Sequence, residues 1–147
     1  MILVVERALL DQIHQHGERA YPDEGAGFLL GADGESRIVR EIFPLPNMRE
    51  AGERYHRYMI DPRDYMKAEV AAQQRSMDVI GVFHSHPDHP DRPSEYDREW
   101  AQPQFSYLIT RIESGKATGS KSWRLANDRT QFVEEEVRVV STRLKVI

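Results

Sequence analysis

The chain has 147 residues, a net charge of −4 and no cysteine, so disulfides and thiol chemistry are excluded and a reducing, cytoplasmic location is expected. It contains neither a clustered basic run nor an apolar stretch approaching the ~20 residues of a membrane span, so we expect no nucleic-acid or membrane partner. The length predicts one domain over residues 1–147 and leaves the oligomeric state open.

The first half of the chain alternates helical and strand patterns. Residues 6–20 carry an apolar stripe at helical spacing, which predicts the first helix (Leu9, Ile13, His16 and Ala20). Residues 27–30 and 37–45 are predicted to pair as strands around a polar turn. Asp61 and Pro62 provide a helix cap and a first helical residue, so we expect a second helix to start there.

The second half contains one strongly apolar strand and weaker signals after it. Residues 79–83 are mostly β-branched or aromatic, which predicts a buried strand. A proline-rich loop follows, and Ser94 occupies an N-cap position before a short helix over residues 95–101. Residues 105–112 and 122–126 are predicted to form a hairpin around a Ser-Gly-Lys-Ala-Thr-Gly loop.

The last segment with a clear pattern is residues 132–140. Its apolar and β-branched residues predict a strand, although a run of three glutamates is also compatible with a short helix. The whole order of elements permits a mixed sheet with helices beside it.

Three candidate metal ligands follow the buried strand. His84 and His86 lie two positions apart, and alternation of side chains along a strand places both on the same face, with Ser85 on the other. The loop is long enough to bring Asp97 back over the end of this strand. Three protein ligands with a fourth position open are typical of a catalytic zinc site.

Other interpretations of the same residues are available. A His-x-His pair in a loop is often only solvated, and Ser94 with Asp97 also forms a capping box. The run from His84 to His89 also spells His-x-His-x-Asp-His, the signature of the metallo-β-lactamase family, but no histidine follows position 89 to complete a binuclear site. We therefore expect Asp88 and His89 to be loop residues.

A distant motif extends the first interpretation. Residues 22–31 read Pro-x-Glu-x-x-Gly-x-Leu-x-Gly, and they are followed by His-x-His-Pro, six residues, Ser, two residues and Asp. In this pattern the chain resembles the JAMM/MPN zinc metalloprotease family, in its small prokaryotic form. The resemblance covers most of the chain and implies an α/β (α+β) fold, with a mixed sheet flanked by helices and a cytidine-deaminase-like layout.

The resemblance also implies a role for each matching residue. His84, His86 and Asp97 would hold one Zn²⁺ per chain, and Glu24 would act as general base and then general acid in hydrolysing a peptide or isopeptide bond. Ser94 would donate a hydrogen bond to the oxyanion or to the attacking water. Because a two-histidine, one-carboxylate set also suits ferrous iron, the choice of zinc depends mainly on the resemblance.

The substrate is the least constrained part of the prediction. The site is compact, as in the small prokaryotic members, which are associated with ubiquitin-like sulfur-carrier proteins and release what is attached to the carboxyl-terminal diglycine. Such a tail is extended and is able to add to a free sheet edge. The positively charged or aromatic residues before the second helix are expected to be solvated (Arg49, Arg54, Arg57 and Tyr58). The alternative function is a non-catalytic, zinc-binding scaffold that binds a ubiquitin-like partner.

Overall fold

The computed structural model describes residues 1–46 and 60–141, and the predicted solvated segment around Arg49 to Tyr58 lies outside these ranges. Three helices and seven strands occur within the described ranges. They are β1 (Ile2–Glu6), α1 (Arg7–Ala20), β2 (Ala26–Ala32), β3 (Ser36–Pro44), α2 (Pro62–Gln74), β4 (Asp78–Pro87), α3 (Glu95–Trp100), β5 (Ser106–Glu113), β6 (Lys116–Leu125) and β7 (Phe132–Val140).

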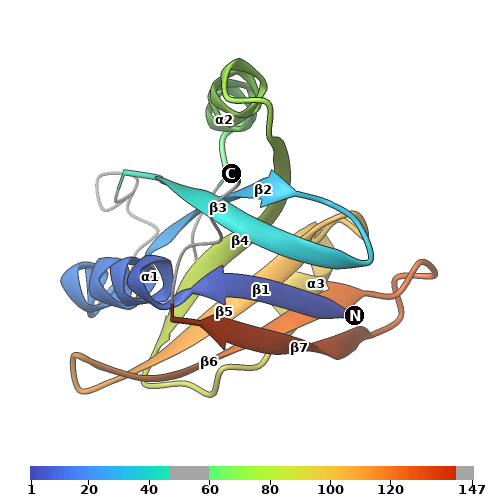
Figure 1. Ribbon diagram of the computed structural model, residues 1–147. Helices are drawn as coiled ribbons and strands as arrows, with labels where there is room; N and C mark the ends of the chain where they lie inside the picture. The colour runs from blue at the N-terminus through green and yellow to red at the C-terminus, as the bar shows by residue number, and fades with distance from the viewer. Residues whose placement is uncertain (47–59, 142–147) are drawn as a thin grey trace.

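The strands form a mixed sheet that curves into a closed barrel in the order β1-β3-β2-β4-β5-β6-β7 (Figure 1). β1 pairs in parallel with both β3 and β7, and β4 pairs in parallel with β5, whereas the other pairs are antiparallel. Helices flank this sheet, so the predicted fold class is confirmed. In this order every described strand has a neighbour on each side, although β3 pairs with β1 only over Ser36–Ile38.

The strand β1 is absent from the sequence prediction, which began with a helix. The apolar run Ile2–Val5 is too short to be distinguished from the start of that helix, and its partners lie far away in the sequence. Leu3 pairs with Arg37 of β3 on one side and with Val137 of β7 on the other. Burial of Leu3 and Val5 by these distant strands gives this segment its extended form.

The hairpin of β5 and β6 is longer than predicted. Its turn consists of Ser114 and Gly115, both with positive φ (48° and 87°), as in a two-residue type I′ connection. Residues 116–119, which we expected to be part of the loop, instead belong to β6 and pair with β5. They form a strand because the register is already set by the tight turn, although none of them is buried.

The final strand is confirmed, and the helical alternative for its glutamates is wrong. Glu134 is exposed but Glu135 is only 2% exposed, as the two-residue period of a strand requires. The Glu135 carboxylate accepts hydrogen bonds from Ser122 Oγ (2.7 Å) and Arg124 Nε (2.7 Å) of β6. These partners compensate for burying the charge.

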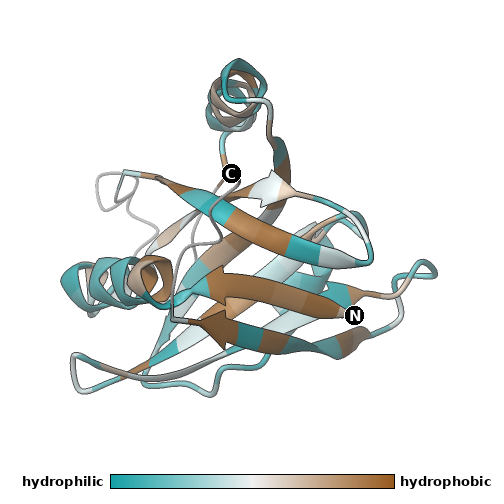
Figure 2. Cartoon of the chain, in the orientation of Figure 1, coloured by the Kyte–Doolittle hydropathy of each residue, from teal (hydrophilic) through white to brown (hydrophobic). Residues whose placement is uncertain are grey.

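Two apolar cores lie on opposite faces of the sheet. On one face, Leu10 and Ile13 of α1 pack with Leu29 and Leu108, and on the other the small side chains of α2 pack against Phe28 and its neighbours. β2, β4 and β5 are therefore buried on both faces, which explains their nearly continuous apolar sequences. Figure 2 shows apolar residues concentrated on strands such as β1, while the outer turns of α1 are hydrophilic.

The buried stripe of α1 is shifted from the one we predicted. Leu10, Ile13, Gly17 and Ala20 are buried, whereas Leu9 and His16 are only half-buried at its border. α2 starts at Pro62 with the Asp61 side chain as its N-cap, as predicted. Within residues 1–46 and 60–141, no helix is long and apolar enough to cross a membrane.

Candidate metal centre

Glu24 lies beside the histidines because the chain just before β2 is bonded to β4. Gly25 N–H donates to Ser85 Oγ (2.9 Å), and Ser85 N–H donates to the Gly25 carbonyl (3.0 Å). The next residue, Ala26, pairs with His84 in the antiparallel register of β2 and β4. This pairing brings together residues sixty positions apart in the sequence.

The two histidines lie on one face of β4, as the strand alternation predicted. His84 and His86 are buried, and their ring centroids are 4.9 Å apart. His84 Nδ1 lies 3.6 Å from Glu24 Oε1, and both side chains are nearly inaccessible to solvent. Ser85 points to the opposite face, where its Cβ lies close to Gly17 of α1.

Helix α3 brings the third predicted ligand to the same place. Ser94 Oγ accepts a hydrogen bond from Asp97 N–H (3.1 Å), and Asp97 Oδ2 accepts one from Ser94 N–H (2.7 Å), so the capping box is formed. The same carboxylate lies 3.8 Å from His84 Nε2 and 3.2 Å from His86 Nε2. Asp97 therefore takes part in the capping box of α3 and also lies beside both histidines.

The protonation states of this cluster suit a metal ion. Burial lowers the pKa of His84 to about 4, so its imidazole is neutral at pH 7. Burial alone would raise the pKa of Asp97, but the two histidines and the Ser94 amide outweigh it and hold this pKa well below the usual range. Metal binding requires neutral imidazoles and ionised carboxylates.

The orientation of His86 is fixed by a loop carbonyl. Its Nδ1 lies 2.8 Å from the Pro90 carbonyl oxygen, which can only accept, so Nδ1 carries the hydrogen. Nε2 is then the ring nitrogen that faces Asp97 and the one available to a metal ion. A hydrogen bond of this kind to the second ring nitrogen is the usual support of a metal-binding histidine.

The donor set fits a borderline-soft cation such as zinc. One side-chain donor atom from each of Glu24, His84 and His86 lies within 4.8 Å of the others, and Asp97 approaches both histidines from α3. Nitrogen and carboxylate oxygen are common zinc ligands, and the same set also suits ferrous iron. By the distances between donor atoms alone, Glu24 fits the position of a metal ligand as well as His84 and His86 do.

A polar cavity of about 440 Å³ opens beside this cluster. We use the name polar cavity for the space lined by Glu24, His86, Ser94 and Tyr96 together with loop residues that include His89 and Arg92. Ser94 therefore faces the same cavity as Glu24. His89 borders the cavity but is not among the described residues whose donor atoms cluster within metal-binding distance.

The His-x-His-x-Asp-His pattern does not converge on a second metal position. Asp88 adopts a positive φ (55°), and its carboxylate accepts hydrogen bonds from the Tyr21 hydroxyl and from Ser114 N–H. Asp88 therefore links the loop after β4 to the turn of the β5–β6 hairpin. His14 is also engaged elsewhere, since its Nε2 lies 2.9 Å from Ser120 Oγ.

Two supporting contacts were not anticipated from the sequence. For the contact between Gly25 and Ser85, the sequence offered one indication, which is that Ser85, a small residue with a hydroxyl, lies between the two histidines. The second is Arg129, whose guanidinium donates to the carbonyls of Ala101 (2.8 Å), Glu99 (3.2 Å) and Arg98 (3.3 Å) at the end of α3. No local pattern connects residue 129 with a helix some thirty positions earlier.

Comparisons with known proteins show similarity over most of the chain. The family model for prokaryotic homologs of the JAB domain matches residues 6–126. A probable TtuB-protein conjugate cleaving protease from Thermus thermophilus is 32% identical over 74% of this chain and 70% of its own length. A CysO-cysteine peptidase from Mycobacterium tuberculosis is 26% identical over 95% of this chain and 92% of its own.

A solved structure shares the fold over nearly the whole chain. The solution structure of a Desulfitobacterium hafniense protein superposes with a TM-score of 0.82 at 30% identity, covering 95% of this chain and 94% of that one. The similarity therefore extends beyond the motif to the arrangement of the entire sheet.

Proposed function

This chain belongs to the prokaryotic JAB group of the JAMM/MPN family and is a hydrolase, and from that premise we propose that it is a zinc-dependent peptidase acting after the carboxyl-terminal diglycine of a ubiquitin-like or sulfur-carrier protein. One domain spanning residues 1–147 would carry the activity. The observation that most supports the proposal is the convergence of Glu24 with the buried His84, His86 and Asp97 at one edge of a polar cavity.

Zinc would be held by His84, His86 and Asp97, one ion per chain. The bound ion would supply Lewis acidity, which lowers the pKa of a water to about 7 and polarises a carbonyl. The lowered pKa of His84 and of Asp97 supports this assignment, because no proton has to be displaced from either residue at pH 7.

Glu24 would take up a proton from the attacking water and return it to the leaving amine. Its carboxylate borders the polar cavity and lies 3.6 Å from the His84 ring, so it is next to the proposed metal position. The two hydrogen bonds between Gly25 and Ser85 hold this part of the chain in place before substrate arrives. Preorganisation of this kind lowers the cost of reaching the transition state.

Ser94 would hydrogen-bond the oxyanion that forms when the carbonyl is attacked. In the capping box its oxygen accepts a bond from Asp97 N–H, which leaves its own O–H available as a donor. The hydroxyl oxygen therefore accepts a hydrogen bond from the helix, and its hydrogen would be donated to the substrate. Its place in the polar cavity beside Glu24 supports this second role.

The substrate class is supported by the relatives. One is a probable TtuB-protein conjugate cleaving protease and another is a CysO-cysteine peptidase. By analogy, this chain would cleave the bond that joins a carrier's carboxyl-terminal glycine to an amine. A tail ending in two glycines is narrow enough to pass a metal centre enclosed by buried side chains.

The decisive experiment uses a carrier protein fused through its diglycine to a short peptide. We expect the purified zinc-loaded protein to release the peptide, and expect chelation of the metal or Glu24→Gln to stop the release. Tight binding of the carrier with no hydrolysis by the zinc-loaded wild type would instead identify a scaffold. Absence of both binding and hydrolysis for any diglycine fusion would contradict the proposed substrate class.

A further inference from the structure

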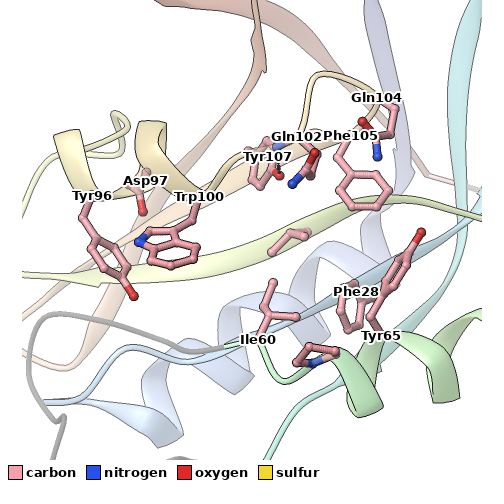
Figure 3. A pocket seen from close by; sticks show the side chains of 12 residues that line it. Phe28, Ile60, Tyr65, Tyr96, Asp97, Trp100, Gln102, Gln104, Phe105 and Tyr107 are labelled. Atoms are coloured by element: carbon pink, nitrogen blue, oxygen red, sulfur yellow. Dashed lines mark hydrogen bonds between the residues drawn. The ribbon is translucent and has the colours of Figure 1, made fainter. Parts of the chain in front are cut away.

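A second cavity, of about 400 Å³, meets the metal centre at Asp97 (Figure 3). We call it the aromatic pocket and define it by Phe28, Tyr65, Tyr96, Trp100, Phe105 and Tyr107. It lies between α2 on one side and α3 with the start of β5 on the other, and Figure 3 shows the rings facing into it. The pocket is a feature that neither the metal chemistry nor the capping of α3 requires.

The lining combines a rigid apolar surface with a few polar groups. The rings of Phe28, Tyr65 and Phe105 support one another, with centroids 5.7 and 5.9 Å apart in successive pairs. Gln102 and Gln104 contribute the amides, and Trp100 at the border is 68% exposed. Pockets that are mainly aromatic with a few polar groups are typical of ligand sites.

The position of Glu24 assigns the two cavities to opposite sides of the scissile bond. Glu24 lines the polar cavity and not the aromatic pocket, whereas Asp97 lines the aromatic pocket. A group that protonates the leaving amine must lie next to that amine. On this ground the amine would depart through the polar cavity, and the carrier tail, which is the acyl side of the substrate, would approach past Asp97 along the aromatic pocket.

The sequence of the tail then determines which residue reaches the rings. The two residues before the scissile bond are glycines and have no side chain to place. An extended chain advances about 3.3 Å per residue, so the first side chain occurs two residues, or roughly 7 Å, before the carbonyl under attack. The aromatic pocket starts at Asp97 and extends away from it, as a site for that side chain must.

We propose that the aromatic pocket is a specificity site for a large apolar side chain at the third position before the scissile bond, immediately upstream of the diglycine. This inference rests on the proposed function, since it assumes a diglycine tail at the metal. A cavity of about 400 Å³ is larger than an alanine needs and accommodates leucine or phenylalanine. Substrate selection by such a pocket depends on the apolar surface buried there.

The test compares two fluorogenic peptides with the zinc-loaded protein. Acetyl-Ala-Leu-Gly-Gly-aminomethylcoumarin and acetyl-Ala-Ala-Gly-Gly-aminomethylcoumarin differ only at the third position before the bond. We expect kcat/KM to be at least about tenfold higher for leucine, the range that a hydrophobic pocket gives for a few methylene groups. The Trp100→Ala variant should reduce this ratio, and Gln104→Glu should shift the preference towards lysine at the same position.

Met66→Ala is the matched control. Met66 is an apolar residue of α2 that is 63% exposed and does not line the aromatic pocket, so its removal should leave the ratio unchanged. Trp100 and Gln104 are themselves exposed, so neither variant is expected to unfold the protein. A leucine-to-alanine ratio near one, with both peptides cleaved, would overturn the inference and leave the proposed function intact.

A binding measurement separates the inference from failure of catalysis. Calorimetry on the Glu24→Gln variant with the product peptides acetyl-Ala-Leu-Gly-Gly and acetyl-Ala-Ala-Gly-Gly should show about tenfold tighter binding of the leucine peptide. If the wild-type protein hydrolyses no peptide, the proposed function is wrong. The ratio of the two peptide affinities then tests by itself whether the pocket binds the tail. Equal affinities, or selectivity that depends only on the residue after the bond, would refute the assignment of the pocket to the tail.

Discussion

Gly25 and Ser85 exchange two hydrogen bonds, one from each backbone N–H, and through them the residue next to Glu24 is fixed to the residue between the two histidines. Ser85 thus takes part in the site without facing it. Its hydroxyl accepts the Gly25 N–H in a buried position, where no water replaces a lost partner.

Ser85→Ala should therefore lower both stability and activity while the zinc remains bound. The unpaired Gly25 N–H is expected to cost about 1–3 kcal/mol in the free energy of unfolding. Because Glu24 is then less firmly placed, kcat should fall, whereas the zinc content should stay near one per chain. Ser120→Ala is the control, because Ser120 hydrogen-bonds His14 and Thr110 away from the metal centre and should affect stability alone.

Glu24→Gln should separate metal binding from catalysis. The amide keeps the shape of the side chain but cannot accept the proton of the water, so hydrolysis should fall by about two to four orders of magnitude. The affinity for the carrier should change little, as the cavities are preserved. Single-turnover rates and carrier affinities measure both effects, and Glu18→Gln on α1 is the control. A wild-type rate in Glu24→Gln would eliminate Glu24 as the general base.

Removing any of the three proposed ligands should release the metal. His84→Ala, His86→Ala and Asp97→Ala are each expected to lower zinc occupancy sharply from about one per chain, as measured by elemental analysis after dialysis against a weak chelator. His89→Ala is the matched control, because His89 borders the polar cavity outside the donor cluster. Two zinc ions per chain, one of them lost in His89→Ala, would favour a binuclear site instead.

Ser94→Ala should reveal the two roles of this hydroxyl. Loss of an N-cap costs about 1 kcal/mol of stability, whereas loss of an oxyanion donor raises the barrier by roughly 3 kcal/mol, or more than a hundredfold in rate. Thermal melts and single-turnover rates of the zinc-loaded variant distinguish the two. A lowered melting temperature with an unchanged rate in Ser94→Ala would leave capping as the only role of this hydroxyl.

Arg129 should influence zinc affinity from the far end of α3. Its guanidinium donates to three carbonyls at the end of the helix that carries Asp97, and Arg98 donates back to the Arg129 carbonyl (2.9 Å). Arg129→Ala frees these carbonyls and loosens the short helix, so we expect zinc affinity to fall by about tenfold, as for other outer supports of metal ligands. Competition with a chelator measures this, and Arg138→Ala, an exposed pair with Glu136, should have no effect.

Features that depend on short spacing along the chain could be predicted from the sequence alone. His84 and His86 lie on one face because a strand repeats every two residues, and Ser94 and Asp97 form a capping box because a helix start places residues three apart within hydrogen-bond reach. The buried strand and the start of α2 follow from β-branched residues and from Asp61 before Pro62 in the same way. These are local properties, and they were predicted correctly.

The contacts between distant segments could not be predicted in this way, because they form only in the folded chain. The closure of the barrel needs β1 to lie between β3 and β7, and no periodicity within residues 2–6 specifies those partners. The position of Glu24 depends on bonds to Ser85, the end of α3 depends on Arg129, and the aromatic pocket gathers rings from β2, α2, α3 and β5. Contacts of this kind are set by packing between elements rather than by local propensity, so the pattern of any one segment does not contain them.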